Sequence, residues 1–122
     1  MNYLAIAFGA VLGALLRHTL FGIIKSDSFP YHTLVVNIIG CFFIGVFAEY
    51  CILKGNMPLP VRLFFITGLL GSFTTFSSFA LDTGFLVDKG EILKTFFYVG
   101  SSVLLGLASY FAAVYLLRSL MR

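Results

Sequence analysis

The chain has 122 residues, of which 60% are hydrophobic and 11% are charged, and its formal net charge is +3. A soluble domain of this size could not bury so much apolar surface, so the composition favours a membrane protein with lipid as its solvent. The few basic residues form no cluster, which argues against a nucleic-acid-binding protein.

Four apolar stretches separate the charged residues, and each is near the length of about 20 residues that a helix needs to cross a bilayer. Backbone groups at membrane depth must be paired internally, so each stretch is predicted to be a transmembrane helix. The spans cover residues 2–24, 33–53, 61–87 and 92–117, and the whole chain, 1–122, is predicted to be a single transmembrane domain. Too little sequence remains outside them for a catalytic domain, so no enzymatic activity is expected.

The first predicted helix carries small residues at the spacing of helix contacts. Gly9 and Gly13 lie one turn apart, which lets two helix backbones approach closely where lipid provides no hydrophobic drive. Arg17 follows in the same helix. Its side chain could extend to the lipid–water interface, or it could supply a fixed positive charge that draws anions into a vestibule.

The second predicted helix contains an amide, Asn37, with Thr33 one turn before it on the same face. An amide at this depth can bond a neighbouring helix, or it can present N–H donors to an anion in a pore wall, with Thr33 orienting it. Cys41 and Cys51 point about 80° apart around the helix, so they cannot bridge within it. We interpret both as packing residues.

The third predicted helix contains a polar run at residues 68–79, GLLGSFTTFSSF. Glycine disfavours helix, and Ser and Thr hydroxyls can bond the local backbone, so this density predicts an unwound turn. Unwound backbone at this depth must be buried in protein or line a polar cavity, where free carbonyls could hold a cation and free N–H groups an anion. The alternative is a continuous helix whose hydroxyls bond carbonyls one turn away.

Three phenylalanines in that run, Phe73, Phe76 and Phe79, have the spacing of one helical stripe. Such a stripe usually serves packing. The functional interpretation uses the positive edge of the aromatic ring, against which an anion can lie in a dry pore. Neighbouring hydroxyls could then donate hydrogen bonds to the same ion, and the run supplies Thr75, Ser77 and Ser78.

The fourth predicted helix places Tyr98 and Ser102 one turn apart on one face. Their hydroxyls could form successive steps for a dehydrated anion. The alternative is an interfacial position for Tyr98 and a helix contact for Ser102.

Short loops make consecutive helices antiparallel, so both termini are expected on one side of the membrane. Four basic residues fall on each side: Lys54, Arg62, Arg118 and Arg122 on one, and Arg17, Lys25, Lys89 and Lys94 on the other. Orientation normally follows an imbalance of Lys and Arg. A chain without that imbalance is predicted to insert both ways up and to form an antiparallel, dual-topology dimer. The alternative is a weak bias that sets one orientation.

Three segments together resemble the Fluc family of fluoride channels, also called CrcB-like proteins. They are GSFTTFSSF at 71–79, GALLR at 13–17 and TLVVNIIG at 33–40, and the resemblance covers nearly the whole chain. The resemblance implies a dual-topology homodimer in the inner (plasma) membrane, with two antiparallel pores that export fluoride passively.

By motif position, the resemblance implies that Phe76 and Phe79 are the pore phenylalanines and that Asn37 is the pore amide. The implied fluoride pore comprises Phe76, Phe79, Asn37, Ser78, Tyr98, Ser102 and Thr33. Arg17 would lie near the pore entrance. One structural Na⁺ at the dimer centre would be held by the backbone carbonyls of Gly71 and Thr74.

The chain departs from the family pattern at two positions. Ser72 stands where the family usually has glycine or another small residue, and Gly106 stands one turn after Ser102, where a third hydroxyl is often found. The hydroxyl track could be shorter in this chain, or Ser109 could compensate.

Two other functions fit four short helices. A proton-coupled multidrug exporter would need an acidic residue deep in the first helix, which this chain lacks, and Asp82 and Glu49 lie nearer span ends. It also has no Trp for an aromatic drug pocket. A membrane scaffold subunit would explain the glycines, but it would not explain the clustered hydrogen-bond donors.

Overall fold

The computed structural model describes all 122 residues, and helices are its only regular elements. Four stretches are long and apolar enough to cross a membrane: Asn2–Ile23, Tyr31–Lys54, Leu59–Asp88 and Ile92–Leu120. The third stretch is built from several elements and is interrupted after Phe73. The predicted all-helical fold with four spans and a broken third span is therefore confirmed.

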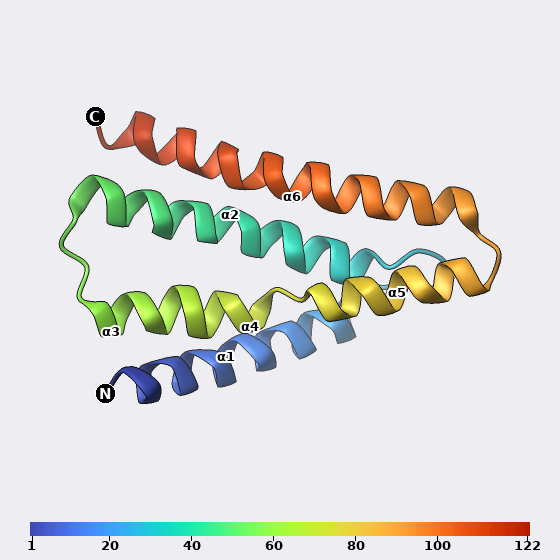
Figure 1. Ribbon diagram of the computed structural model, residues 1–122, viewed down its shortest axis with the longest axis horizontal. Helices are drawn as coiled ribbons and strands as arrows, with labels where there is room; N and C mark the ends of the chain where they lie inside the picture. Colours follow the sequence, from blue (N-terminus) through green and yellow to red (C-terminus); the bar gives the residue numbers. More distant parts are fainter.

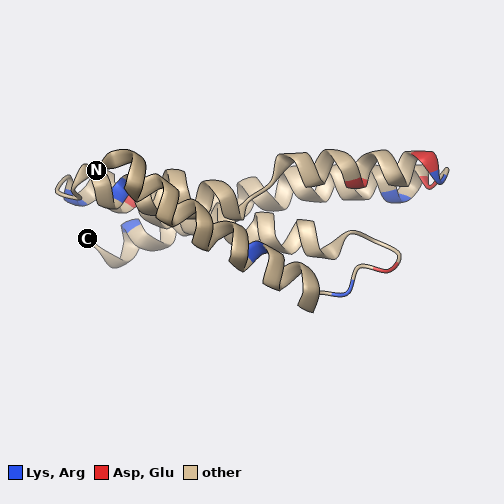
Figure 2. Ribbon diagram, turned by 90° about the horizontal axis from the view of Figure 1, so that it is seen from below, with Lys and Arg blue, Asp and Glu red and all other residues tan.

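The chain folds as antiparallel rods with both termini at the same end (Figure 1). The elements are α1 (Asn2–Ile23), α2 (Tyr31–Lys54), α3 (Leu59–Arg62), η1 (Leu63–Leu70), α4 (Gly71–Phe73), α5 (Phe76–Asp88) and α6 (Ile92–Leu120). Most charged residues lie towards the two ends of the bundle (Figure 2). This distribution suits an apolar middle in hydrocarbon and polar ends at the headgroups.

The observed helix ends differ from the predicted ones for local reasons. α2 already begins at Tyr31, because Pro30 fits directly before a first turn, where its missing N–H leaves no bond unmade. Gly55 ends α2 with a φ of 65°, and Gly90 turns the chain between α5 and α6 with a φ of 73°. Both angles lie in the left-handed region that favours glycine.

Glycines bring α1 almost into backbone contact with the third span. A Cβ on Gly68 would lie only 2.6 Å from the carbonyl oxygen of Ile6, and a Cβ on Gly13 would meet the carbonyl of Leu69 and the hydroxyl of Ser72. That hydroxyl in turn lies 2.8 Å from the carbonyl oxygen of Ala10 on α1. The predicted packing role of Gly13 is thus realised against η1 and α4.

Helix α2 packs along α6 through small residues and two polar links. A Cβ on Gly45 would lie 2.6 Å from the carbonyl oxygen of Tyr110. Ser109 Oγ donates to the carbonyl of Ile38 at 2.9 Å. Towards the other end, Arg118 Nε donates to the buried Glu49 carboxylate at 2.8 Å. The Glu49 side chain is only 3% exposed and the Arg118 side chain is 43% exposed, so the buried carboxylate is neutralised by a counter-ion that reaches the surface.

The break lies at Thr74 and Thr75. Both residues are extended, with ψ angles of 153° and 112°, between the end of α4 and the start of α5. The side chain of Thr75 caps the new helix by accepting a hydrogen bond from the N–H of Ser78 at 3.0 Å. The third span therefore stops and restarts within the membrane, as the polar run predicts.

We expect Gly13→Ala to destabilise the fold by about 1–3 kcal/mol, because its Cβ would press on the backbone of η1 and force the helices apart. Thermal unfolding in detergent measures this loss. Gly22→Ala, on the same helix, is the matched control, because a Cβ there meets nothing within 4 Å. Equal melting temperatures for the two variants would contradict the proposed close contact.

Candidate functional site

One pocket gathers side chains from three spans at the level of the break. It is lined by Asn37 from α2, Phe76 and Phe79 from α5, and Ser102 and Val103 from α6. We call it the inner pocket. The structure thus brings together four of the seven residues of the predicted fluoride pore, although they lie far apart in the sequence.

The Asn37 side chain forms hydrogen bonds with the backbone at the break. Its amide nitrogen donates to the carbonyl of Thr75 at 3.1 Å, and its amide oxygen accepts from the N–H of Thr75 at 2.8 Å. One N–H of the amide remains for a group in the inner pocket. The expectation that Thr33 orients this amide is wrong, because Thr75 holds it and Thr33 is bonded elsewhere.

The three phenylalanines do not form one stripe, because the extended residues at the break separate them. Phe73 is 5% exposed and lines a separate, wholly apolar pocket with residues such as Leu16 and Phe43. Phe76 and Phe79 stay together, with ring centroids 5.4 Å apart. Phe76 is 80% exposed, so its ring projects beyond the surface of this single chain.

Ser102 presents an unused hydroxyl to the inner pocket. Its Oγ is buried and has no hydrogen-bond partner, and such groups are uncommon in folded proteins. A second, almost wholly apolar groove continues from Ser102 along α2 and α6 past Gly106. Ser109 does not replace the hydroxyl missing at Gly106, because its own hydroxyl is bonded to the carbonyl of Ile38.

Two predicted pore residues meet at a carboxylate instead of lining the inner pocket. Thr33 and Tyr98 are both 0% exposed, and both donate to Oδ2 of Asp82, at 2.6 and 3.1 Å. Asp82 was predicted to lie near a span end, and no pore role was assigned to it. Its position one turn after Phe79 on the same helix, within a membrane span, was the signal for a functional role.

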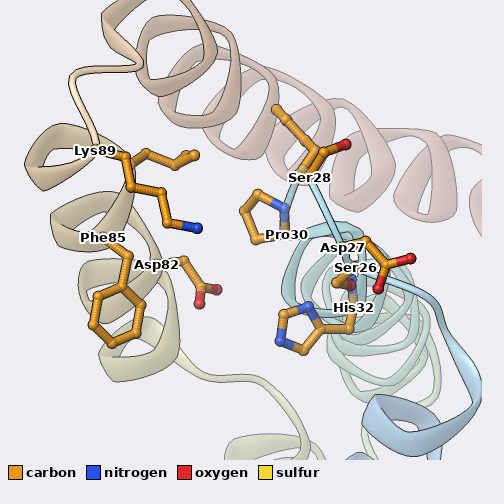
Figure 3. Close-up of a pocket in the computed structure, with 10 residues that line it drawn as sticks. Ser26, Asp27, Ser28, Pro30, His32, Asp82, Phe85 and Lys89 are labelled. Carbon is orange, nitrogen blue, oxygen red and sulfur yellow. The ribbon is translucent and has the colours of Figure 1, made fainter.

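A second pocket, which we call the mouth, opens at the end of the bundle beyond this network (Figure 3). His32 and Asp82 project into it from α2 and α5, and the Lys89 side chain extends over it from the end of α5. Its lining residues are Ser26, Asp27, Ser28, Phe29, Pro30, His32, Asp82, Phe85, Leu86 and Lys89. The mouth is therefore polar and charged, whereas the inner pocket carries no charged side chain.

The break releases the two carbonyls that the family resemblance assigns to a cation. In a continuous helix the carbonyl of Gly71 would accept from the N–H of Thr75, and that of Thr74 from the N–H of Ser78. Those two N–H groups instead donate to Asn37 and to the Thr75 hydroxyl. Backbone carbonyl oxygens are ligands that suit a hard cation, so both residues fit this role.

The other two predicted site residues lie outside both pockets. Ser78 donates its N–H to the cap on Thr75, and its side chain is partly exposed. Arg17 is partly exposed on α1, which packs against the third span and not against α6. The roles of Ser78 and Arg17 stay predictions.

Comparison with known proteins agrees with these features. The family model described as "CrcB-like protein, Camphor Resistance (CrcB)" matches residues 4–114. The fluoride-specific ion channel FluC of Rhodopseudomonas palustris is 41% identical, over 98% of this chain and 99% of that protein. Proteins of the same name from Rhizobium etli and Granulibacter bethesdensis are 42% and 38% identical, over 96% and 100% of this chain and 96% and 98% of theirs. The chain therefore belongs to the CrcB-like family of membrane proteins.

Proposed function

We propose that this chain is a fluoride channel of the plasma membrane that lets fluoride leave the cell passively. The relatives named fluoride-specific ion channel support this function along the whole chain. The observation that carries it is the inner pocket, where an unpartnered hydroxyl on Ser102 and a spare amide N–H on Asn37 face two phenylalanine rings.

The physical difficulty for such a channel is dehydration. An isolated ion in a low-dielectric medium costs tens of kcal/mol, so donors along the path must replace the lost water. A hydroxyl, an amide and ring edges can do this without a fixed positive charge that would trap the ion. The membrane potential supplies the direction, because it disfavours an anion on the negative side by about 2.3 kcal/mol per 100 mV.

The multidrug-exporter alternative is not supported. The relatives are named fluoride-specific ion channels and not multidrug exporters. No acidic side chain lies in α1, and the pocket that faces the break holds no carboxylate to carry protons.

An antiparallel homodimer completes this proposal. The balanced basic residues predict insertion in both orientations, and Phe76 projects 80% of its surface from the single chain at the level of the pocket. A second, inverted copy would cover that ring and close the open side of the groove on α2 and α6. Two equivalent pores would follow from the two-fold symmetry.

A structural Na⁺ at the two-fold axis is the second element of the proposal. The freed carbonyls of Gly71 and Thr74 support it, since each lost its helical donor at the break, and Gly71 is exposed on the surface of the chain. When bound, the ion would supply positive charge that fixes two unwound backbones against each other. It takes no part in the passage of fluoride.

In liposomes loaded with potassium fluoride, we expect the purified chain to release fluoride on addition of valinomycin and to release no chloride. Phe76→Leu should slow release by about tenfold or more, because an aromatic contact of about 1.4 kcal/mol corresponds to that factor in rate. A fluoride electrode measures both rates.

Phe96→Leu is the matched control, because Phe96 is similarly exposed, at 74%, but lines neither pocket. Absence of fluoride release by the unmodified chain, or equal release of chloride, would rule out the proposed function. Equal slowing by the Phe76 and Phe96 variants would show that the inner pocket is not part of the fluoride pathway.

Replacing Na⁺ with N-methylglucamine during purification should weaken the dimer. If Na⁺ is normally present at 100 times its dissociation constant, its removal should lower the free energy of unfolding by about 2.7 kcal/mol. Thermal unfolding with and without restored Na⁺ measures the difference, and K⁺ at equal ionic strength is the control. Unchanged stability without Na⁺ would show that the freed carbonyls hold no sodium.

A further inference from the structure

We propose that the ionised carboxylate of Asp82 occupies hydroxyl donors that fluoride needs in the pore. Protonation of Asp82 then opens the route between the mouth and the inner pocket. This inference rests on the proposed function and adds a proton-controlled barrier to it. It assigns a positioning role to a side chain that the sequence prediction set aside.

The barrier lies between the two pockets. Phe79, one turn before Asp82 on α5, lines the inner pocket, and Asp82 lines the mouth. On α6, Ser102 lines the inner pocket, and Tyr98, one turn before it, is fully buried with its ring 5.3 Å from that of Phe79. The Tyr98 ring thus contacts a residue of the inner pocket, and its hydroxyl contacts a residue of the mouth.

Those hydroxyls have no proton to spare. Thr33 and Tyr98 each carry one O–H, and both are directed at Oδ2 of Asp82. While the carboxylate is ionised, neither group can donate to a passing fluoride. The carboxylate also carries the same charge as the ion, so in this low-dielectric region it repels fluoride from the donors that would replace its water.

Protonation reverses both effects. The second carboxylate oxygen, Oδ1, accepts no hydrogen bond from the chain, and Asp82 faces the polar mouth, so a proton can reach it from water (Figure 3). A neutral carboxyl group no longer repels an anion, and it becomes a donor itself. Thr33 and Tyr98 are then free to turn their protons towards fluoride.

The surrounding charged and titratable groups are few. The mouth is lined by Asp82 together with His32 on α2, Lys89 at the end of α5 and Asp27 in the first loop. Tyr98 faces Asp82 from α6. Lys94, at the start of α6, is engaged with the carbonyl of Ser28 and with Glu91. His32 is the other ionisable side chain that projects into the mouth beside Asp82, so its effect must be separated from that of Asp82 by experiment.

The test is the valinomycin-dependent fluoride release from liposomes between about pH 8 and about pH 5.5. Hydrogen fluoride crosses lipid without charge and without valinomycin, so the valinomycin-independent rate is subtracted. We expect the rate of the unmodified chain to rise as pH falls, because a larger fraction of the chains then carries a proton on Asp82. Asp82→Asn should be fast at pH 8 and independent of pH.

His32→Gln is the control and should keep the slope of the unmodified chain. Loss of the slope in His32→Gln, or its persistence in Asp82→Asn, would overturn the inference. A folded Asp82→Asn dimer that releases no fluoride would overturn it too, because the carboxylate would then be required for passage. If Asp82→Asn does not fold, Asp82→Glu replaces it: this variant keeps a carboxyl group and should keep a pH slope in a His32→Gln background, whereas a flat profile there contradicts the proposal.

The inference and the proposed function can fail separately. If the chain releases fluoride at one rate from pH 8 to about pH 5.5, the proposed function stands and the proposed barrier is contradicted. A chain that releases no fluoride at any pH loses the proposed function itself.

Discussion

Backbone polar groups at membrane depth need partners inside the protein, and the pairing of Asn37 with Thr75 meets that need at the one place where the third span is broken. Without this amide, the N–H and carbonyl of Thr75 would lie unpaired in a dry interior. With it, the chain can stop α4, turn through two extended residues and start α5 in a new direction. The inner pocket, the freed carbonyls and the separation of Phe73 from Phe76 all follow from this pairing.

The fold was predictable because the membrane limits the choices. Length and hydropathy determine four helices, and the density of Gly, Ser and Thr at residues 68–79 locates the break. The direction of the chain after the break was not predictable, because it depends on a tertiary bond from α2. The assumption of a single helical stripe therefore grouped Phe73 with Phe76, although the structure places their rings in different pockets.

Hydrogen-bond partners across helices were also beyond the sequence. Residues such as Thr33, Tyr98 and Ser109 were interpreted from spacing along one helix, which gives the shared face but not the acceptor on the next helix. The structure gives Thr33 and Tyr98 a carboxylate as acceptor and gives Ser109 a backbone carbonyl. Ser102 keeps a buried hydroxyl without a partner beside Phe76 and Phe79. The number of hydrogen-bond donors that remain free for an ion therefore depends on how the helices pack.

The proposed channel depends on a broken helix, closed by Asn37, that creates a dry pocket whose donors and ring edges hold fluoride. An experimental structure in lipid nanodiscs, determined with fluoride present, tests it most directly. We expect extended backbone at Thr74 and Thr75, the Asn37 amide bonded to Thr75, and density for an ion between the ring edges of Phe76 or Phe79 and Ser102. A continuous third helix, or an inner pocket filled by lipid with no ion beside the rings, would contradict the account.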